Sequence, residues 1–354
     1  MRNVLITGSS GLVGSEAVSF FDQRGWAVHG VDNNMRAAFF GPEGDTSWNL
    51  RRLKASTRHF THHRLDLRRR AAVVNLVQTL RPDLLIHCAA QPSHDLARER
   101  PFDDFDVNAS GTVNLLEAAR RSCPESPFIF MSTNKVYGDA PNERPLIEHP
   151  SRYDYADPAD YEGIDESCRI DASFHSVFGA FKTAADLAVQ EYGRNFEMPT
   201  VCFRAGCITG SKHSGVEPHG FLAYLARAVR EQRTYRIFGY KGKQVRDNIH
   251  AYDVCEAFLA FYERPRVAAV YNLGGTRANS LSVQEAIARL ESLVGHPLRT
   301  QYLDEPRRGD HICYMSDVRR FKTDYPTWGV TRSLEAILQE LAACVHSPCQ
   351  GFTS

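Results

Sequence analysis

The sequence lacks a charge excess, a long apolar run and a disulfide framework, and each absence excludes a class of protein. Its 42 basic residues equal its 42 acidic residues, so the net charge does not indicate a nucleic-acid partner. No stretch approaches the roughly 20 apolar residues of a membrane span, and "MRNVLITG" leads directly into a strand with no signal-peptide pattern. Nine cysteines without a CxxC pair favour neither a structural zinc site nor paired disulfides. We therefore expect a cytoplasmic globular protein that binds neither nucleic acid nor membrane.

Short apolar runs alternate with helical patterns through the first 200 residues. The runs are "NVLITG" (3–8), "AVHGVD" (27–32), "LLIHCAA" (84–90), "FIFMST" (128–133) and "TVCFRA" (200–205). This alternation predicts an α/β protein with a doubly wound parallel sheet, the Rossmann architecture. It weakens after residue 205, although "YNLGG" (271–275) looks like a strand that returns to the sheet. We predict a Rossmann domain over 1–205, with 236–275 returning to it, and a smaller α/β substrate-binding lobe mainly over 206–350.

A glycine-rich turn lies between the first strand and its helix. "TGSSGLVG" contains Gly8, Gly11 and Gly14, which allow a tight turn and let backbone amides approach a diphosphate. Asp32 ends the second strand 18 residues after Gly14, where a carboxylate binds ribose hydroxyls and repels a 2′-phosphate. The sequence therefore predicts NAD as cofactor. The other predicted cofactor contacts are Leu12, Val13, Asn33, Asp66, Leu67, Ala89, Ala90, Gln91 and Asn108.

Several further motifs make a specific resemblance. They are "AAQPS", "NASGTVNLLEAA", "STNKVYGD", "YEGIDES", "DASFHSVFGAFKTAAD", "YKGKQVRDNIHAYDV", "YNLGGT" and "EPRRGDH". With the glycine turn they span nearly the whole chain, which resembles the extended short-chain dehydrogenases/reductases of the NAD-dependent epimerase/dehydratase family. "STNKVYGD" and "GKQVRD" are most similar to the branch of 2-epimerases that act on CDP-linked sugars. The resemblance implies transient oxidation of a sugar carbon, with a hydride passing to NAD while a base takes the hydroxyl proton.

The family's motifs also imply roles for individual residues. Thr133 would hydrogen-bond the reacting hydroxyl, Lys182 would hold the nicotinamide ribose, and position 178 would carry a catalytic Tyr. Arg246 and Arg308 would bind the substrate diphosphate, with 219–225 near the nucleotide base. The family commonly forms homodimers through the helices that correspond to 108–122 and 178–194.

Two departures from the family pattern affect the predicted chemistry. Asn134 and Lys135 stand where 4,6-dehydratases have an Asp-Glu pair, which disfavours a dehydration that uses that pair. Phe178 stands where the Tyr is expected, so the proton-carrying hydroxyl is missing. An acid–base group contributes roughly 10²–10⁴-fold to a rate, so we expect another residue to replace it.

The sequence leaves four candidates for that residue. They are Lys135, next to Thr133; His175, three residues before Phe178; His94, after the "AAQPS" strand end; and Cys207, after the strand at 200–205. His94, Asn134 and Cys207 are also predicted to contact substrate. We expect no metal site, because strand alternation divides the histidines of "RHFTHH" between two faces and no carboxylate pattern accompanies His213 and His219.

The sequence thus favours an NAD-dependent epimerase that acts on a nucleotide-linked sugar. The alternative in another reaction class is a dehydratase of a nucleotide sugar or nucleoside, which oxidises, eliminates water and reduces. A third interpretation is a catalytically impaired protein that only binds NAD.

Overall fold

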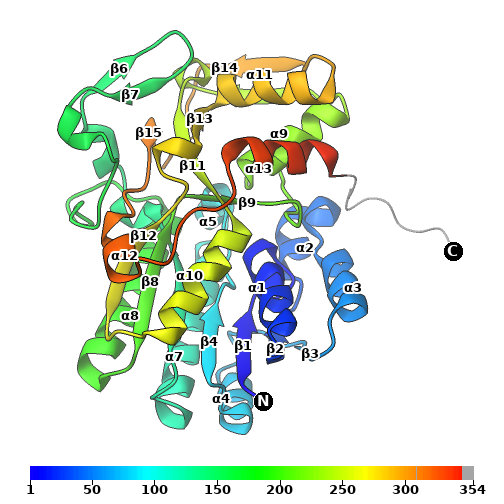
Figure 1. Ribbon diagram of the computed structural model, residues 1–354, viewed down its shortest axis with the longest axis vertical. Coiled ribbons are helices and arrows are strands. Elements are labelled where there is room, and N and C mark those ends of the chain that lie inside the picture. Colours follow the sequence, from blue (N-terminus) through cyan, green and yellow to red (C-terminus); the bar gives the residue numbers. More distant parts are fainter. Residues whose placement is uncertain (308, 345–354) are drawn as a thin grey trace, which may run out of the picture.

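A seven-stranded parallel sheet forms the base of the molecule in the computed structural model, which describes residues 1–307 and 309–344 (Figure 1). Its strand order is β12-β8-β5-β4-β1-β2-β3, and every neighbouring pair is parallel. The strands are β1 (Asn3–Thr7), β2 (Ala27–Val31), β3 (Phe60–His63), β4 (Leu84–His87), β5 (Phe128–Thr133), β8 (Thr200–Ala205) and β12 (Ala269–Leu273). This doubly wound order confirms the predicted fold class.

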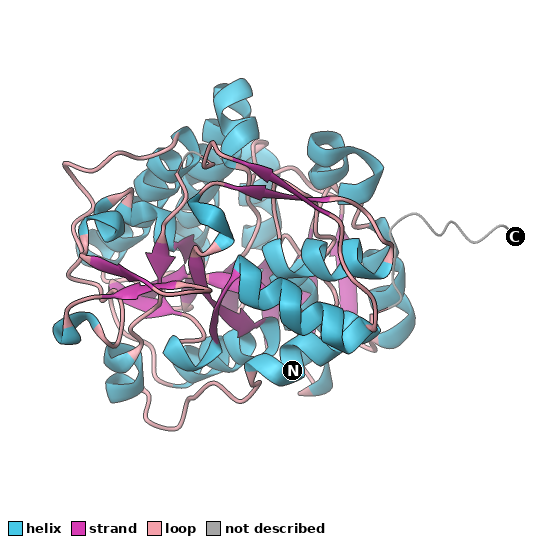
Figure 2. Ribbon diagram, turned by 90° about the horizontal axis from the view of Figure 1, so that it is seen from above, coloured by secondary structure: helices cyan, strands magenta, loops and turns pink. Residues whose placement is uncertain are grey.

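Helices cover both faces of the sheet (Figure 2). One face carries α1 (Leu12–Gln23), α3 (Ser47–Ser56) and α10 (Ala251–Glu263); the other carries α4 (Arg70–Leu80), α7 (Gly111–Ser122) and α8 (Val177–Phe196). In β1, Val4 and Ile6 pack with α1 and α10, whereas Leu5 packs with α4 and α7. A parallel strand covered on both sides needs apolar residues at consecutive positions, which is why these strands read as continuous apolar runs.

A smaller lobe lies above the carboxyl ends of the strands (Figure 1). Its elements are β9 (Cys207–Thr209), α9 (Phe221–Arg230), β10 (Tyr235–Phe238), β11 (Val245–His250), β13 (Ser280–Ser282), α11 (Val283–Val294), β14 (Thr300–Leu303), β15 (Cys313–Tyr314) and α13 (Leu334–Ala343). The three helices share one apolar core that includes Leu225, Leu290 and Leu338. The side chains of Ser282 and Glu285 form a capping box that starts α11.

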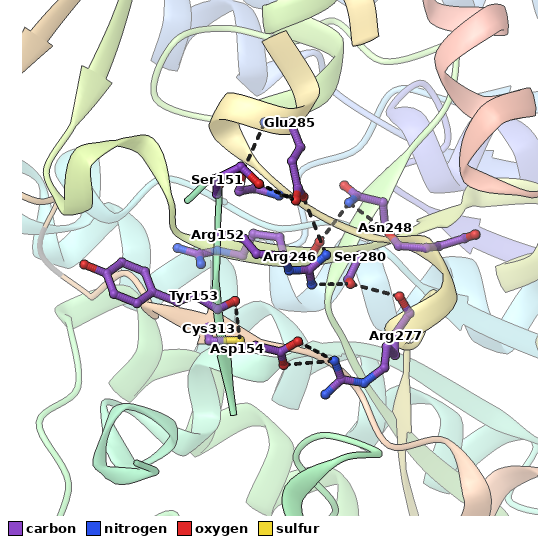
Figure 3. A network of polar contacts seen from close by, with 12 residues as sticks. Ser151, Arg152, Tyr153, Asp154, Arg246, Asn248, Arg277, Ser280, Glu285 and Cys313 are labelled. Carbon is purple, nitrogen blue, oxygen red and sulfur yellow. Dashed lines mark hydrogen bonds and ion pairs between the residues drawn. The ribbon is translucent and has the colours of Figure 1, made fainter. Parts of the chain in front are cut away.

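The long connections contain structure of their own. Residues 34–54 form α2 (Met35–Phe40), a 3₁₀ turn (Gly41–Gly44) and most of α3, and 139–173 include the hairpin β6 (Leu146–Glu148) and β7 (Tyr153–Tyr155). Figure 3 shows how that hairpin is tied to the lobe: Arg277 contacts Asp154 at 2.7 Å, and Arg152 donates to Ser280 at 2.9 Å. Shorter helices lie between the named elements at His94–Glu99 (α5), Pro101–Phe105 (α6) and Arg319–Asp324 (α12).

The structure corrects the predicted domain boundaries. The start of the segment 236–275 belongs to the lobe, because β10 pairs with β14 and β11 pairs with β9, β13 and β15. Only α10 and β12 of that segment return to the large sheet. Val318, Phe321 and Trp328, which were predicted in the lobe, instead pack in the core beside α10 and β12. No helix in the described part of the chain is long and apolar enough to cross a membrane.

Candidate active site

The glycine turn has the geometry that a dinucleotide diphosphate requires. Gly8 adopts a φ of 67° and its amide donates to the Val31 carbonyl at 2.8 Å. A Cβ on Gly14 would lie 2.1 Å from the Gly8 carbonyl oxygen, so only glycine allows α1 to start this close to β1. Gly8, Gly11, Leu12, Val13 and Gly14 line one end of a cavity of about 480 Å³. The start of α1 thus faces a space that suits an anion.

The adenosine end of the same cavity contains the predicted acidic residue. Asp32 accepts hydrogen bonds from the backbone amides of Ser10 at 2.9 Å and Asn34 at 2.7 Å. These bonds fix the carboxylate at the cavity wall, which Asn33, Asp66 and Leu67 also line. The arrangement suits an adenosine ribose.

The strand end after β4 is organised differently from what the sequence predicted. Ala89 and Ala90 line the cavity, but Gln91 and Asn108 are not among its lining residues. They hold each other instead: the Gln91 amide donates to Asn108 Oδ1 at 3.1 Å, and Asn108 Nδ2 donates to the Gln91 carbonyl at 2.9 Å. Both side chains also donate to Asp104 Oδ1. Their place is therefore behind the cofactor wall, where they fix the loop.

Lys182 reaches the same cavity from α8. It is buried in α8, donates from Nζ to the Met131 carbonyl at 2.8 Å, and lines the cavity. Burial lowers its pKa to about 8. One helical turn earlier, Phe178 lines the same cavity, and its ring meets the His94 ring edge-on at 5.0 Å. Where the family motif has a Tyr hydroxyl, this chain therefore has the apolar ring of Phe178 packed against the imidazole of His94.

Lys135 places a second amine in this part of the cavity. It follows Thr133 and Asn134 at the end of β5, and all three residues line the cavity. Its Nζ donates to the Gly309 carbonyl at 2.9 Å and lies 3.7 Å from Asp310 Oδ1. Burial lowers the pKa of Lys135 to about 8, against the opposing effect of Asp310. An amine with such a pKa can gain and lose a proton near neutral pH.

The other three candidates for the proton-transfer group have less suitable surroundings. His94 lines the cavity, but its Nδ1 contacts Ser176 Oγ at 2.6 Å and burial lowers its pKa to about 4. Cys207 lines the cavity, and burial raises the pKa of its thiol to about 11. His175 is not among the lining residues; its two ring nitrogens face backbone carbonyls at 3.0 and 2.8 Å. The geometry thus favours Lys135.

Positive charge continues into the lobe. Arg246 lines the cavity, donates from Nη1 to the Val245 carbonyl at 2.8 Å, and lies 3.6 Å from Asp310. It starts from β11, next to the network that ties down the hairpin (Figure 3). Arg307 also lines the cavity, although the sequence predicted this role for its neighbour Arg308, which lies outside the described residues. The Arg307 guanidinium stacks 4.2 Å from the ring centre of Phe238.

Aromatic side chains line the lobe end of the cavity. They are Phe221, Tyr224, Tyr235 and Phe238, of which the first two fall within the predicted range 219–225. Apolar rings next to cationic side chains suit a nucleotide whose base packs on the rings and whose phosphates contact the arginines. The sequence analysis did not predict Arg36, Arg307 and Asp310 as cavity residues. Arg307 and Asp310 both belong to the motif "EPRRGDH", which was the available sequence signal for them.

The chain belongs to the NAD-dependent epimerase/dehydratase family, whose model matches residues 4–274. It is 33% identical over 325 residues to CDP-paratose 2-epimerase of Salmonella typhi, covering 90% of this chain and 91% of that protein. It is 25% identical to dTDP-glucose 4,6-dehydratase of Haemophilus influenzae, over 95% of this chain and 90% of that protein. Among solved structures, the UDP-glucose 4-epimerase of Thermus thermophilus in complex with NAD superimposes with a TM-score of 0.77 at 23% identity, covering 96% and 98% of the two chains.

The family and the cavity agree on the cofactor. The close approach of Gly14 to Gly8, the fixed carboxylate of Asp32 and the buried amine of Lys182 all border one cavity, and the family and a solved neighbour in complex with NAD point to the same cofactor. NAD is therefore the cofactor of this enzyme.

Proposed function

We propose that this enzyme epimerises a nucleotide-linked sugar through transient oxidation of one sugar carbon, in the manner of a CDP-tyvelose (CDP-paratose) 2-epimerase. One observation carries the proposal: a single cavity joins the glycine turn to Arg246 and contains Lys135 and Lys182 between them. A sugar whose diphosphate contacts the lobe arginines would thus extend toward the nicotinamide end. The 33% identity to a CDP-paratose 2-epimerase over most of the chain supports this substrate class.

The residues of the chain provide the groups that such a reaction needs. When bound, NAD supplies a reversible hydride acceptor. Thr133 at the end of β5 orients the reacting hydroxyl, and the Lys182 amine holds the cofactor ribose and adds positive charge nearby. Phe178 fills the wall with an apolar ring and takes no proton.

We assign the hydroxyl proton to Lys135. As the carbinol C–H bond breaks and its electron pair leaves with the hydride, the O–H bond breaks and the proton bonds to the Nζ lone pair. The resulting ammonium is stabilised by the Gly309 carbonyl and by Asp310. After the ketone turns over, the hydride returns to its other face and Lys135 gives the proton back to the oxygen. Atoms and electrons balance over the cycle, because the sugar alone changes configuration.

A dehydratase is the second candidate, and the apolar Phe178 favours it. Without a phenol at this position, a group acting on the neighbouring carbon could dominate the chemistry, and one relative is a dTDP-glucose 4,6-dehydratase. The replacement of the Asp-Glu pair by Asn134 and Lys135 opposes it, because the amide of Asn134 is a poor acid or base and the pair has no carboxyl group.

Product mass separates these reactions. Purified enzyme is incubated with CDP-, UDP- and GDP-linked sugars and with nucleosides in deuterated water, and the products are analysed by mass spectrometry and NMR. We expect an isomer of a CDP-sugar with inverted configuration at one carbon. Loss of one water would support the dehydratase instead. Bound NAD without turnover of any sugar would support an NAD-binding protein and contradict the proposal.

We also propose a cytoplasmic homodimer. The outer faces of α7 and α8 expose apolar side chains, among them Val113 (38%), Leu187 (40%) and Phe196 (46%). The eight cysteines in the described part of the chain are free thiols, as a reducing compartment maintains. Light scattering after gel filtration should give twice the chain mass for the wild type. L187E should give a monomer; an unchanged mass in that variant would contradict pairing through this face.

A further inference from the structure

Arg36 is a cationic side chain of the cavity wall for which the reaction above has no use. Nη2 donates to the Ser214 carbonyl at 2.7 Å, Nη1 lies 3.4 Å from His219 Nδ1, and the Phe40 ring centre is 4.8 Å from the guanidinium carbon. All of these contacts are uncharged, and within 1–307 and 309–344 no carboxylate pairs with Arg36. Burial lowers its pKa to about 10, which leaves it charged at neutral pH. Arg36 is half-buried, and a shielded charge without a counterion is unfavourable, so an anion is expected at this place.

The two histidines near Arg36 do not supply that anion. A guanidinium can only donate, so His219 Nδ1 accepts in this contact and the ring hydrogen lies on Nε2. The His213 ring lies 5.3 Å from that of His219, and its buried Nδ1 has no hydrogen-bond partner among the residues that the structure describes. Burial lowers the pKa of both histidines, which keeps the rings neutral. The surroundings of Arg36 are therefore neutral and contain further N–H groups, as an anion site requires.

The position of Arg36 in the chain indicates which anion it meets. Arg36 follows Asp32 by four residues, in the segment that leaves the adenosine-side strand β2. The Ser10 amide of the glycine turn donates to Asp32 at 2.9 Å, and Asn49 of α3 donates to the Ser10 carbonyl at 3.0 Å. The segment is thus attached at both ends to the turn that receives the cofactor diphosphate.

The same segment is also attached to the lobe. Glu43 contacts Arg227 at 3.1 Å and Arg233 at 2.6 Å. Trp48 Nε1 donates to Ser214 Oγ at 3.0 Å, and that hydroxyl donates to the Asp45 carbonyl at 3.2 Å. Arg36 therefore stands between the cofactor end of the cavity and the loop 213–219.

We propose that Arg36 binds a phosphate of the cofactor diphosphate and couples it to the loop 213–219 through the Ser214 carbonyl. The glycine turn would hold the diphosphate from one side and the guanidinium from another. Bound NAD would then order the loop whose far end, at Gly220, leads into α9 and the aromatic end of the cavity. The nucleotide sugar carries the same phosphate chemistry, so the test distinguishes the two sources.

The test measures exchange of bound NAD in the purified holoenzyme, which does not depend on the sugar substrate. Bound NAD is exchanged against isotope-labelled NAD and followed by mass spectrometry after rapid gel filtration. We expect R36Q to exchange NAD at least about tenfold faster than the wild type, because it loses charge-assisted hydrogen bonds. The matched control is R51Q, because Arg51 is exposed on α3, donates to Ser47 and does not line the cavity; it should stay within about twofold.

Two further readouts complete the test. Amide hydrogen exchange of residues 213–219 should rise in NAD-loaded R36Q and not in R51Q. Calorimetric Kd values of CDP and UDP for the NAD-loaded enzyme should change by less than about threefold. Exchange of NAD within about twofold of the wild type would overturn the proposal, and a tenfold rise in the nucleotide Kd alone would assign the anion to the substrate. If R36Q does not fold, R36M decides, because methionine keeps much of the side-chain volume without the charge; wild-type exchange in R36M would overturn the proposal.

Discussion

Replacing Lys135 with methionine removes the amine that we assign to proton transfer and preserves most of the side-chain volume. An acid–base group contributes roughly 10²–10⁴-fold, so kcat of K135M should fall by about that factor. The stability should change in the other direction. A pKa lowered from 10.5 to about 8 corresponds to about 3 kcal/mol of unfolding free energy that the buried ammonium costs. Loss of the hydrogen bond to Gly309 offsets part of the gain, at about 1 kcal/mol.

The same pKa fixes the pH dependence of both quantities. Because the folded pKa lies below the unfolded value, the unfolded chain binds more protons between about pH 8 and 10.5, and stability rises with pH in that window. Below pH 8 the full cost is present, so K135M should be at least as stable as the wild type at pH 7. For turnover, the neutral amine amounts to about one-tenth of Lys135 at pH 7 and about nine-tenths at pH 9. The wild-type kcat should therefore rise about tenfold over this range.

The assay is the NMR-detected conversion of the best sugar nucleotide between pH 6.5 and 9.5, with thermal unfolding measured in the same buffers. K243M is the matched control: Lys243 is equally shielded, at 14% side-chain exposure, but pairs with Glu148 and does not line the cavity. It should keep kcat within about twofold. A K135M enzyme within tenfold of the wild type, or a flat wild-type pH profile, would refute the assignment. A variant that loses activity and stability together would indicate a structural role instead.

Three other substitutions give separate predictions. F178Y should retain bound NAD and add a phenol beside Lys182, so its kcat at pH 7 should equal or exceed that of the wild type. A more than tenfold fall in kcat would contradict the prediction that a hydroxyl fits at this position. G14A should purify without NAD absorbance, because its Cβ would lie 2.1 Å from a turn carbonyl, whereas G329A, with no atom within 4 Å, should purify with NAD. D186N removes the negative charge that pairs with the buried guanidinium of Arg204 at 2.8 Å, and denaturant unfolding should show a loss of about 3–5 kcal/mol; a loss below 1 kcal/mol would contradict it.

The parts of the site that follow from local pattern could be predicted from the sequence. The turn at Gly8–Gly14 and the position of Asp32 depend on one strand, one turn and the next strand, so spacing alone places them. Gln91 follows a strand end in the same way, yet its side chain donates to Asp104 and to the Ser93 carbonyl and does not line the cavity. Spacing fixes where a residue lies but not which partner satisfies a polar side chain.

Residues whose role depends on distant partners could not be predicted. Arg36 meets Ser214 and His219, which lie 178 and 183 positions later, and no periodicity links them. Arg307 stands outside a regular element, where neither the helical nor the strand repeat predicts which way its side chain points. The roles assigned to Lys135, Thr133 and the other catalytic residues stay predictions until the variants are measured.

The placement of Trp328 in the core beside β12 has a consequence for how the protein is made. The large sheet up to β8 is complete in sequence at Ala205, but its core still needs α10, β12 and the residues around Trp328. At roughly 5–20 residues per second, the ribosome would add those last residues on the order of 10 s after β8. Until α10 and β12 have been synthesised, the edge of β8 and the apolar face that later meets α10 would stay uncovered. The lobe is synthesised in the meantime, so nascent-chain folding should proceed with the two units interleaved and not one after the other.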